Sequence, residues 1–348
     1  MTARVIAIGI IFCLLSLLVR AQSEWQVVTS GLDTNLRGVS TAVFKDARGI
    51  VGEAVWASGS NGVILRSLDS GKSWERLHIA GGEALDFRGV VADGARIAYV
   101  MSSGSGDKSR IYKTSDGGKS WKLQYTDKHQ EFFLDSIACE SQKKCVALSD
   151  PVNGKFLLLE TTNRQHWKPL PADNMPAALP GEGAFAASNS CLALQGSDIF
   201  FGTGGPAARV FHSPDFGRTW TVAEIPIAHG NPSSGIFSIT VRRAGSVTDL
   251  VAVGGDYQKP QQAAGVSAVS FDAGKSWQLS AQQPGGYRSA VAGYMTVGPT
   301  GEDISDNAGF DWKPAGSLSL NAITATRAGM WAAGPHGTVA RLWAMGRE

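Results

Sequence analysis

The chain has 348 residues, 43% of them hydrophobic, and its 32 Lys and Arg residues nearly balance its 30 Asp and Glu residues. This length allows one large all-β domain or two domains of ordinary size. A net charge of +2 without any Lys/Arg-rich run provides no general attraction to nucleic acid, so nucleic-acid binding is disfavoured.

Residues 1–21 have the features of an export signal. Arg4 precedes a nearly continuous apolar run over residues 5–19, and Val19 and Ala21 occupy the small-residue positions before a cleavage site. A retained membrane anchor is the alternative, but the run is short for a membrane span. Cys13 lies inside the run without a lipobox context, which disfavours a lipoprotein. We therefore expect an exported protein, periplasmic or extracellular, with a mature domain over residues 22–348, 30 basic and 30 acidic residues, and no stable membrane insertion.

A turn motif recurs through the mature chain with the pattern Ser/Thr-x-Asp-x-Gly-x-Ser/Thr-Trp. The four intact copies and one looser copy contain the pairs Asp69 and Trp74, Asp116 and Trp121, Asp215 and Trp220, Asp272 and Trp277, and Asn307 and Trp312. A damaged copy without the glycine ends at Trp167. The carboxylate and hydroxyl can accept hydrogen bonds from backbone N–H groups one or two residues ahead, and the Gly allows a positive φ. Burial of each Trp removes about 150–250 Å² from water. We expect these residues to build the fold rather than to perform chemistry.

The spacing of the tryptophans, between 35 and 57 residues, is typical of one four-stranded meander per repeat, as in a propeller blade of the WD40/YVTN-like kind. Residues 55–66 resemble residues 330–341, so the last repeat has three strands but no turn motif or outer strand. Residues 25–28 form an outer strand with no repeat before them. We predict an all-β, seven-bladed β-propeller whose ring is closed when this N-terminal strand completes the last blade.

Cys139 and Cys145 flank five polar residues between two strand-like runs. They occupy facing positions of a hairpin, and an exported protein would oxidise them to a disulfide. A metal site is the alternative, but no His or second Cys pair lies nearby. Cys191 is left as a buried thiol.

Taken together, the turn motif and segments such as Arg37-Gly38-Val39 with Gly59 to Trp74 make the chain resemble the Asp-box (BNR-repeat) propellers, and most closely the photosystem II stability/assembly factor family. The resemblance covers nearly all of the mature chain. It implies a non-enzymatic helper in the assembly of a membrane complex. Similar proteins occur in bacteria without photosynthesis, so the photosystem itself is not carried over.

Equivalent positions of a propeller converge on its axis. The variable position at the start of each innermost strand holds Arg37, Arg88, Asp135, Phe237, Arg288 and Asn321, with Gly183 assigned to the fourth blade. Arginines around one mouth of the channel could hold a carboxylate, sulfate or phosphate. We therefore name Arg37, Arg88, Asp135, Arg288 and Asn321 as a candidate site for a protein partner or anionic ligand. The alternative is that each Arg pairs with a neighbouring acid or carbonyl.

Three arginines on a propeller also suggest a glycoside hydrolase of sialidase type. Phe87-Arg88-Gly89-Val90 departs from the Phe/Tyr-Arg-Ile-Pro opening of sialidases, and no pair of carboxylates can be assigned to Tyr287 or Tyr294. Two carboxyl groups and a tyrosine beside the arginines would favour the enzyme. We expect a monomeric, non-catalytic binding or assembly scaffold, with the sialidase as the alternative.

No cofactor motif is present. The acidic cluster of residues 302–311 could suggest Ca²⁺, but Asn307 and Gly309 belong to the turn motif, so we expect no metal. Long loops at residues 169–183, 226–235 and 257–265 are candidate binding segments or neutral insertions.

Overall fold

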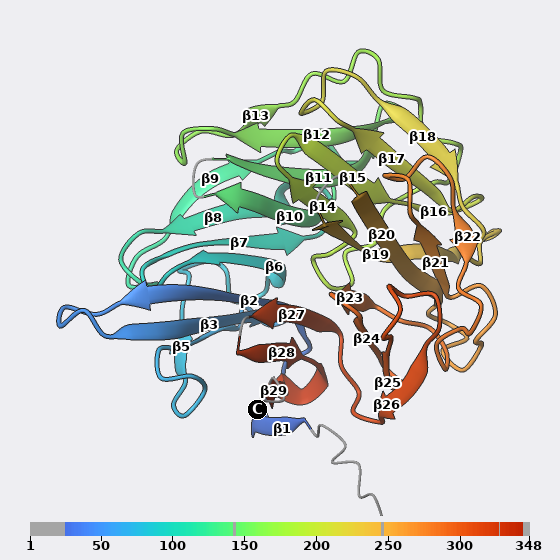
Figure 1. Cartoon of the computed structure of the whole chain (residues 1–348). Helices are drawn as coiled ribbons and strands as arrows, with labels where there is room; N and C mark the ends of the chain where they lie inside the picture. Colours follow the sequence, from blue (N-terminus) through green and yellow to red (C-terminus); the bar gives the residue numbers. More distant parts are fainter. Residues whose placement is uncertain (1–24, 142–143, 245–246, 327, 344–348) are drawn as a thin grey trace, which may run out of the picture.

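The computed structural model describes residues 25–141, 144–244, 247–326 and 328–343. The predicted signal peptide, residues 1–21, lies outside these residues. The described chain forms seven antiparallel sheets, and the innermost strands of successive sheets contact one another around a common axis (Figure 1). This arrangement confirms the predicted seven-bladed propeller.

Blades 1 to 3 follow the chain in simple meanders, with inner strands first. Blade 1 contains β2 (Leu36–Lys45), β3 (Val51–Gly59), β4 (Ile64–Ser67) and β5 (Glu75–Leu77). Blade 2 contains β6 (Asp86–Asp93), β7 (Ile97–Ser103), β8 (Arg110–Thr114) and β9 (Lys122–Thr126), with a 3-10 turn η1 (Gly106–Lys108) before β8. Blade 3 contains β10 (Leu134–Ser141), β11 (Lys144–Val152), β12 (Lys155–Thr161) and β13 (Lys168–Pro169).

Blades 4 to 6 are less regular. Blade 4 contains β14 (Leu192–Gln195), β15 (Asp198–Gly202), β17 (Arg209–Ser213) and β18 (Thr221–Glu224). Blade 5 contains β19 (Asn231–Ala244), β20 (Val247–Asp256), β21 (Ser267–Ser270) and β22 (Gln278–Leu279), and it gains a fifth strand, β16 (Gly204–Gly205), from the chain of blade 4. Blade 6 contains β23 (Ala290–Ala292), β24 (Met295–Gly298), β25 (Gly301–Ile304) and β26 (Lys313–Gly316).

Blade 7 joins the two ends of the described chain. It contains β27 (Ala322–Thr326), β28 (Gly329–Ala333) and β29 (Val339–Trp343), with a 3-10 turn η2 (Pro335–Gly337) before β29. The N-terminal strand β1 (Gln26–Thr29) pairs antiparallel with β29, and Gln26 lies opposite Arg341. This pairing is the predicted closure, and it covers the edge that β29 would otherwise expose (Figure 1).

The turn motif folds as a closed hydrogen-bonded unit. The Ser67 hydroxyl accepts from the amide of Gly71 at 2.8 Å, and the Asp69 carboxylate accepts from the amide and hydroxyl of Ser73 at 2.9 and 2.6 Å. These bonds span four residues, so the expected reach of one or two residues was too short. Ser70 and Gly71 both have positive φ, which is the reason that the chain can turn back so tightly.

The tryptophan after each turn packs toward the preceding blade. Trp74 meets Trp331 of blade 7 edge-on, and Trp121 meets Trp56 of blade 1, both with ring centroids 6.4 Å apart. Seven apolar clusters fill the seven interfaces between successive blades. The core of the molecule is therefore a ring of inter-blade contacts, and the turn motifs lie at its periphery.

The hairpin of β10 and β11 contains the expected disulfide between Cys139 and Cys145, which face each other across the strand pair. Cys191 is a free, buried thiol. Among the residues that the structure describes, no helix has the length and apolar character needed to cross a membrane.

Candidate functional site

Four innermost strands carry a β-bulge at the same place. The pairings β2–β3, β6–β7, β10–β11 and β19–β20 each skip one residue of the inner strand. The skipped residues are Arg37, Arg88, Asp135 and Phe237. A bulge takes its extra residue out of the ladder and re-aims the side chain. All four residues line a cavity of about 520 Å³ at the propeller axis, together with Asn321 from blade 7.

The two arginines of this axial cavity differ in their partners. Arg88 donates from Nε to Asp86 at 2.7 Å and from Nη1 to the Ala186 carbonyl at 3.3 Å. Arg37 has only a long bond of 3.4 Å to the Ala187 carbonyl, and no described carboxylate pairs with it. Burial lowers the pKa of Arg37, and the neighbouring charge of Arg88 lowers it further. The Arg37 guanidinium is therefore a partly desolvated cation that forms no ion pair with a carboxylate of the described residues, although Asp86 is near enough to attract it.

Asp135 lines the same cavity as the two arginines and is fully buried. Among the described residues, neither of its carboxylate oxygens has a hydrogen-bond partner. The nearby amide of Asp150 donates instead to the Phe133 carbonyl at 2.9 Å. Burial raises the pKa of Asp135 well above its usual range, the carboxylate of Asp150 raises it further, and Arg88 opposes both effects. The surroundings of Asp135 therefore favour its neutral form over its charged form.

Asp150 lies on β11, the strand that pairs with β10, and it was not singled out from the sequence. Burial raises its pKa to about 6, although its Oδ1 accepts from the amide of Ala184 at 2.9 Å. By strand pairing, this position corresponds to Ser60 in blade 1 and Ser103 in blade 2. A charged residue where other blades have a small one is the signal that could have revealed it.

Aromatic side chains form the opposite wall of the axial cavity. Phe185 stacks on Phe237 with ring centroids 3.8 Å apart, and Tyr257 and Tyr287 meet Phe237 edge-on. The four rings come from the chain around blades 4, 5 and 6, and Tyr257 is 49% exposed. The cavity is therefore lined by two arginines, by the carboxyl groups of Asp135 and Asp150, and by aromatic rings.

Arg288 does not belong to the axial cavity, which corrects its place in the predicted site. The amide of Leu36 donates to the carbonyl of Gly334 in the preceding blade, and the amide of Arg288 makes the equivalent bond to Gly254. Arg288 therefore takes the apolar position before the variable one, which is filled by Ser289. The sequence alignment of blade 6 was wrong by one residue, because Tyr287 was taken for the apolar residue of the pattern, whereas Arg288 fills that position.

The Arg288 side chain is instead a structural element of blade 6. It is 2% exposed, and it donates from Nε to Asp303 at 2.7 Å and from Nη1 to the Thr300 hydroxyl at 2.7 Å. Asp303 is thereby part of a buried ion pair. The described residues contain no group of three or more His, Cys, Asp or Glu side chains that could hold a metal.

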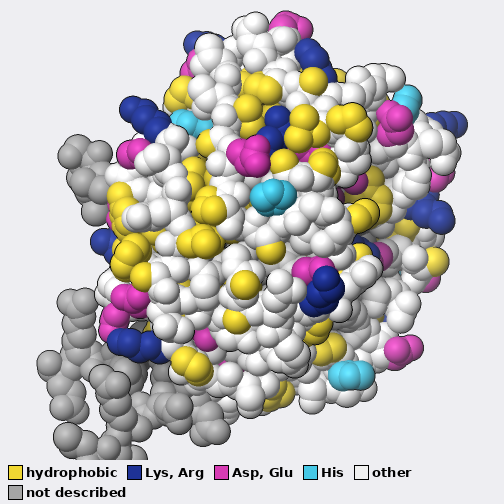
Figure 2. Space-filling view, turned by 90° about the vertical axis from the view of Figure 1, so that its right-hand side faces the viewer, with side chains coloured by type: hydrophobic (Ala, Val, Ile, Leu, Met, Phe, Trp, Pro, Cys, Tyr) yellow, Lys and Arg dark blue, Asp and Glu magenta, His cyan; other side chains and the backbone are white. Residues whose placement is uncertain are grey.

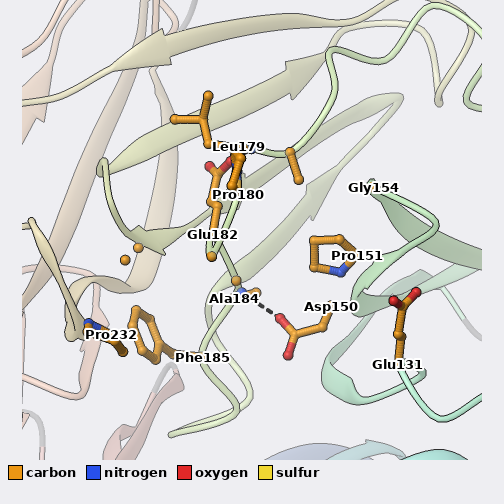
Figure 3. Close-up of a pocket in the computed structure, with 15 residues that line it drawn as sticks. Glu131, Asp150, Pro151, Gly154, Leu179, Pro180, Glu182, Ala184, Phe185 and Pro232 are labelled. Carbon is orange, nitrogen blue, oxygen red and sulfur yellow. Dashed lines mark hydrogen bonds between the residues drawn. The ribbon is translucent and has the colours of Figure 1, made fainter.

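A groove of about 610 Å³ adjoins the axial cavity between blades 3 and 4 (Figure 3). Asp150, Ala184 and Phe185 line both spaces. Farther out, the groove is lined by Pro151, Leu179, Pro180, Glu182, Pro232 and several glycines, including Gly183, which was expected at the axis. The loop at residues 169–183 therefore contributes part of this surface.

One charged contact fixes the loop that forms the wall of this groove. Glu182 is buried and pairs with Arg209 of β17, and its carboxylate also accepts from the Thr203 hydroxyl at 2.6 Å. The amide of Leu179 donates to the same carboxylate at 2.8 Å. The groove is therefore a preformed surface whose lining combines proline and glycine residues with the carboxylates of Glu131 and Asp150.

The axial cavity meets the composition expected of a sialidase, but not its geometry. It holds two carboxyl groups, two arginines and Tyr287. Among the described residues, however, no hydrogen bond joins the Tyr287 hydroxyl to a carboxylate, and full burial raises the pKa of Tyr287 above its ordinary value. A buried phenol without an adjacent base is a poor nucleophile.

Comparison with known proteins identifies one matching family model. A sequence model of the family described as "Photosynthesis system II assembly factor YCF48" matches residues 24–283. A curated relative, the "Photosystem II assembly lipoprotein Ycf48" of Synechococcus sp. (strain CC9902), is 30% identical over 79 residues, which are 22% of this chain and only 22% of the relative's length.

Solved structures share the fold. The structure titled "YCF48 bound to D1 peptide" has a TM-score of 0.57 at 15% identity and covers 92% of this chain and 97% of its own. Virginiamycin B lyase from Staphylococcus aureus has a TM-score of 0.61 at 12% identity and covers 92% of this chain and 99% of its own. At these identities the likeness establishes the propeller and no activity.

Proposed function

The chain belongs to the family of the photosynthesis system II assembly factor YCF48, and we propose that it is a non-catalytic exported scaffold that binds a carboxylate-bearing segment of a partner protein in its axial cavity. The observation that carries the proposal is Arg37, a partly desolvated guanidinium beside Arg88 that forms no ion pair within the described part of the chain. A carboxylate that enters the cavity would pair with it and relieve the repulsion between the two arginines.

Two further features support a protein partner. The groove between blades 3 and 4 adjoins the axial cavity, so an extended chain could continue from one into the other. A solved member of the family is bound to a D1 peptide. The partner of this chain is defined by chemistry alone: a polypeptide with a terminal or side-chain carboxylate next to apolar residues.

Binding to a displayed library of random dodecapeptides with free carboxyl termini tests the proposal. The wild-type protein should enrich peptides with acidic residues near the end. Arg37→Ala with Arg88→Ala should lose at least 10-fold in affinity for the enriched peptides. Arg76→Ala with Arg218→Ala, which removes two exposed arginines outside the cavity, is the matched control. Equal binding by the two double variants would refute the proposed site.

Export and the absence of catalysis are separate parts of the proposal. The disulfide between Cys139 and Cys145 is consistent with an oxidising compartment. Mass spectrometry of the secreted protein should find Gln22 at its amino terminus, and a lipidated or uncleaved chain would contradict cleavage after Ala21. A fluorogenic sialoside should not be hydrolysed above background, whereas turnover that Tyr287→Phe removes would establish the sialidase alternative.

A further inference from the structure

The carboxyl groups of Asp135 and Asp150 line the axial cavity but have no role in holding a carboxylate. Asp135 and Asp150 lie on neighbouring strands of blade 3 and interact with each other electrostatically. Two carboxyl groups below an anion site oppose anion binding if both are ionised. Their presence therefore calls for a second ligand group of opposite charge.

Hydrogen bonding in blade 3 leaves these acids available. Asp135 is fully buried, and neither of its oxygens has a partner among the described residues. Asp150 uses Oδ1 to accept from the Ala184 amide, and its Oδ2 has no described partner; Figure 3 shows this oxygen turned away from Ala184. Burial of a carboxyl group without a hydrogen-bond partner costs free energy of folding, so such a group is rarely found in a purely structural position.

We propose that the cavity recognises a polypeptide segment carrying an ammonium group, from a lysine or an amino terminus, next to the carboxylate bound by Arg37 and Arg88. The ammonium contacts Asp150 Oδ2, and its positive charge favours the ionised form of the neighbouring Asp135 carboxyl. This inference rests on the proposed function, since both charges of the segment lie in the same cavity.

A metal ion is a poorer fit to the same acids. Two carboxyl groups supply fewer oxygens than Ca²⁺ or Mg²⁺ requires, and the described residues add no third acidic, His or Cys ligand. An ammonium group needs only acceptors, and it has three donors to offer. The aromatic rings of Phe237 and Tyr257 on the facing wall provide a surface for the alkyl chain that carries it.

Straight-chain ω-amino carboxylates from 4-aminobutanoate to 8-aminooctanoate are suitable probes, because they vary the distance between the two charges. Each is compared by calorimetry at pH 7 and low salt with the unsubstituted carboxylate of the same length and with the matching alkylamine. We expect the best amino carboxylate to bind at least 10-fold more tightly than its unsubstituted partner.

Variants separate the two halves of the cavity. Asp150→Asn keeps an oxygen for the Ala184 amide, and it should abolish the gain from the amino group while leaving carboxylate binding equal or stronger. Asp150→Glu should retain part of the gain. Asp135→Asn should reduce it, and Asp173→Asn, on an exposed loop, is the control that should not change it. Thermal melting of each variant verifies that it is folded.

The outcomes distinguish this inference from the function on which it rests. If carboxylates bind through Arg37 but the amino group adds nothing, or if Asp150→Asn keeps the gain, the inference is wrong and the anion site stands. If amines bind through Asp150 but carboxylates do not bind, the anion site is wrong. If no probe binds, both are overturned.

Discussion

The turn motifs at the rim and the cavity at the axis use the same residue types in opposite ways. At the rim, Asp69 accepts three hydrogen bonds from Ser67 and Ser73, and these bonds lower its pKa to about 2. At the axis, Asp135 accepts none from the described residues, and burial raises its pKa. The rim repeats a satisfied arrangement around the ring, whereas the axis collects unsatisfied groups that occur once each.

This difference separates structure from function. A motif that recurs from blade to blade and uses its polar atoms internally has little left to offer a ligand. The residues that break the repeat, such as Asp150 where other blades have Ser60 or Ser103, are the ones with free bonding capacity. Substitutions should therefore lower stability at the rim and change binding or pH dependence at the axis.

The largest expected effect is at a rim tryptophan. Trp312 is 1% exposed and donates from its indole N–H to the Ser267 hydroxyl of the preceding blade at 3.0 Å. Trp312→Ala should lower the free energy of unfolding by about 3–5 kcal/mol in urea denaturation, because it leaves a large cavity. Trp343→Ala, at a tryptophan that is 55% exposed, should cost under about 1 kcal/mol. Equal losses for the two variants would contradict the assigned role of the rim.

The second effect is a pH dependence that belongs to the axis. The pKa of Asp150 is raised to about 6, so the folded state binds its proton more tightly than the unfolded chain does. Stability should therefore fall as the pH rises from about 4 to about 6, by an amount on the order of 2–3 kcal/mol. Asp150→Asn should remove this fall in a series of thermal melts. A variant that keeps the wild-type profile would show that another group titrates there.

The disulfide tests whether β10 can contribute to stability through one part of the strand and to binding through another. Cys139 lies on β10, the strand that begins beside Asp135. Cys139→Ala with Cys145→Ala should lower the free energy of unfolding by about 2 kcal/mol, as expected for a short closed loop, and should not alter binding in the axial cavity. A reductant should destabilise the wild-type protein but not this variant. A loss of ligand affinity would show that the two ends of β10 are coupled.

The smallest effect is expected at one turn carboxylate. Asp69→Ala removes bonds at an exposed site and should cost about 1 kcal/mol at neutral pH. Because the folded pKa is lowered to about 2, the contribution of Asp69 is present above about pH 4 and is lost as the pH falls toward 2. Melts of wild type and variant should converge in that range. If the melting temperatures of wild type and variant already coincide at neutral pH, the Asp69 carboxylate does not stabilise the turn.

Most of the fold could be predicted from the sequence, because the blade is a local unit with a visible repeat. The spacing of the tryptophans predicted one four-stranded blade per repeat. The likeness of residues 55–66 to residues 330–341 showed that the last repeat lacks its outer strand, which the segment after Trp25 provides. The reach of the turn bonds was underestimated, because the positive φ of Ser70 has no signature in a non-glycine residue.

The candidate site could be predicted only in part. Arg37, Arg88, Asp135 and Asn321 lie together as expected, but Arg288 does not, because in blade 6 the arginine itself takes the position that the apolar Leu36 holds in blade 1. Asp150 comes from a second strand, and Phe185 from an irregular connection. Their approach to the axis depends on tertiary packing that no single repeat contains.

The pairing of β1 with β29 imposes an order on folding. Gln26 and Arg341 lie at opposite ends of the described chain, so β1 is synthesised long before β29 and cannot pair until β29 has emerged. The entropy cost of so long a closure grows only with the logarithm of loop length, about 0.6 kcal/mol per doubling, but contacts so distant in sequence form slowly. Until they form, β29 has a free edge that can pair with another chain. The last step in the maturation of this ring is therefore also the step at which it is most exposed to misassembly.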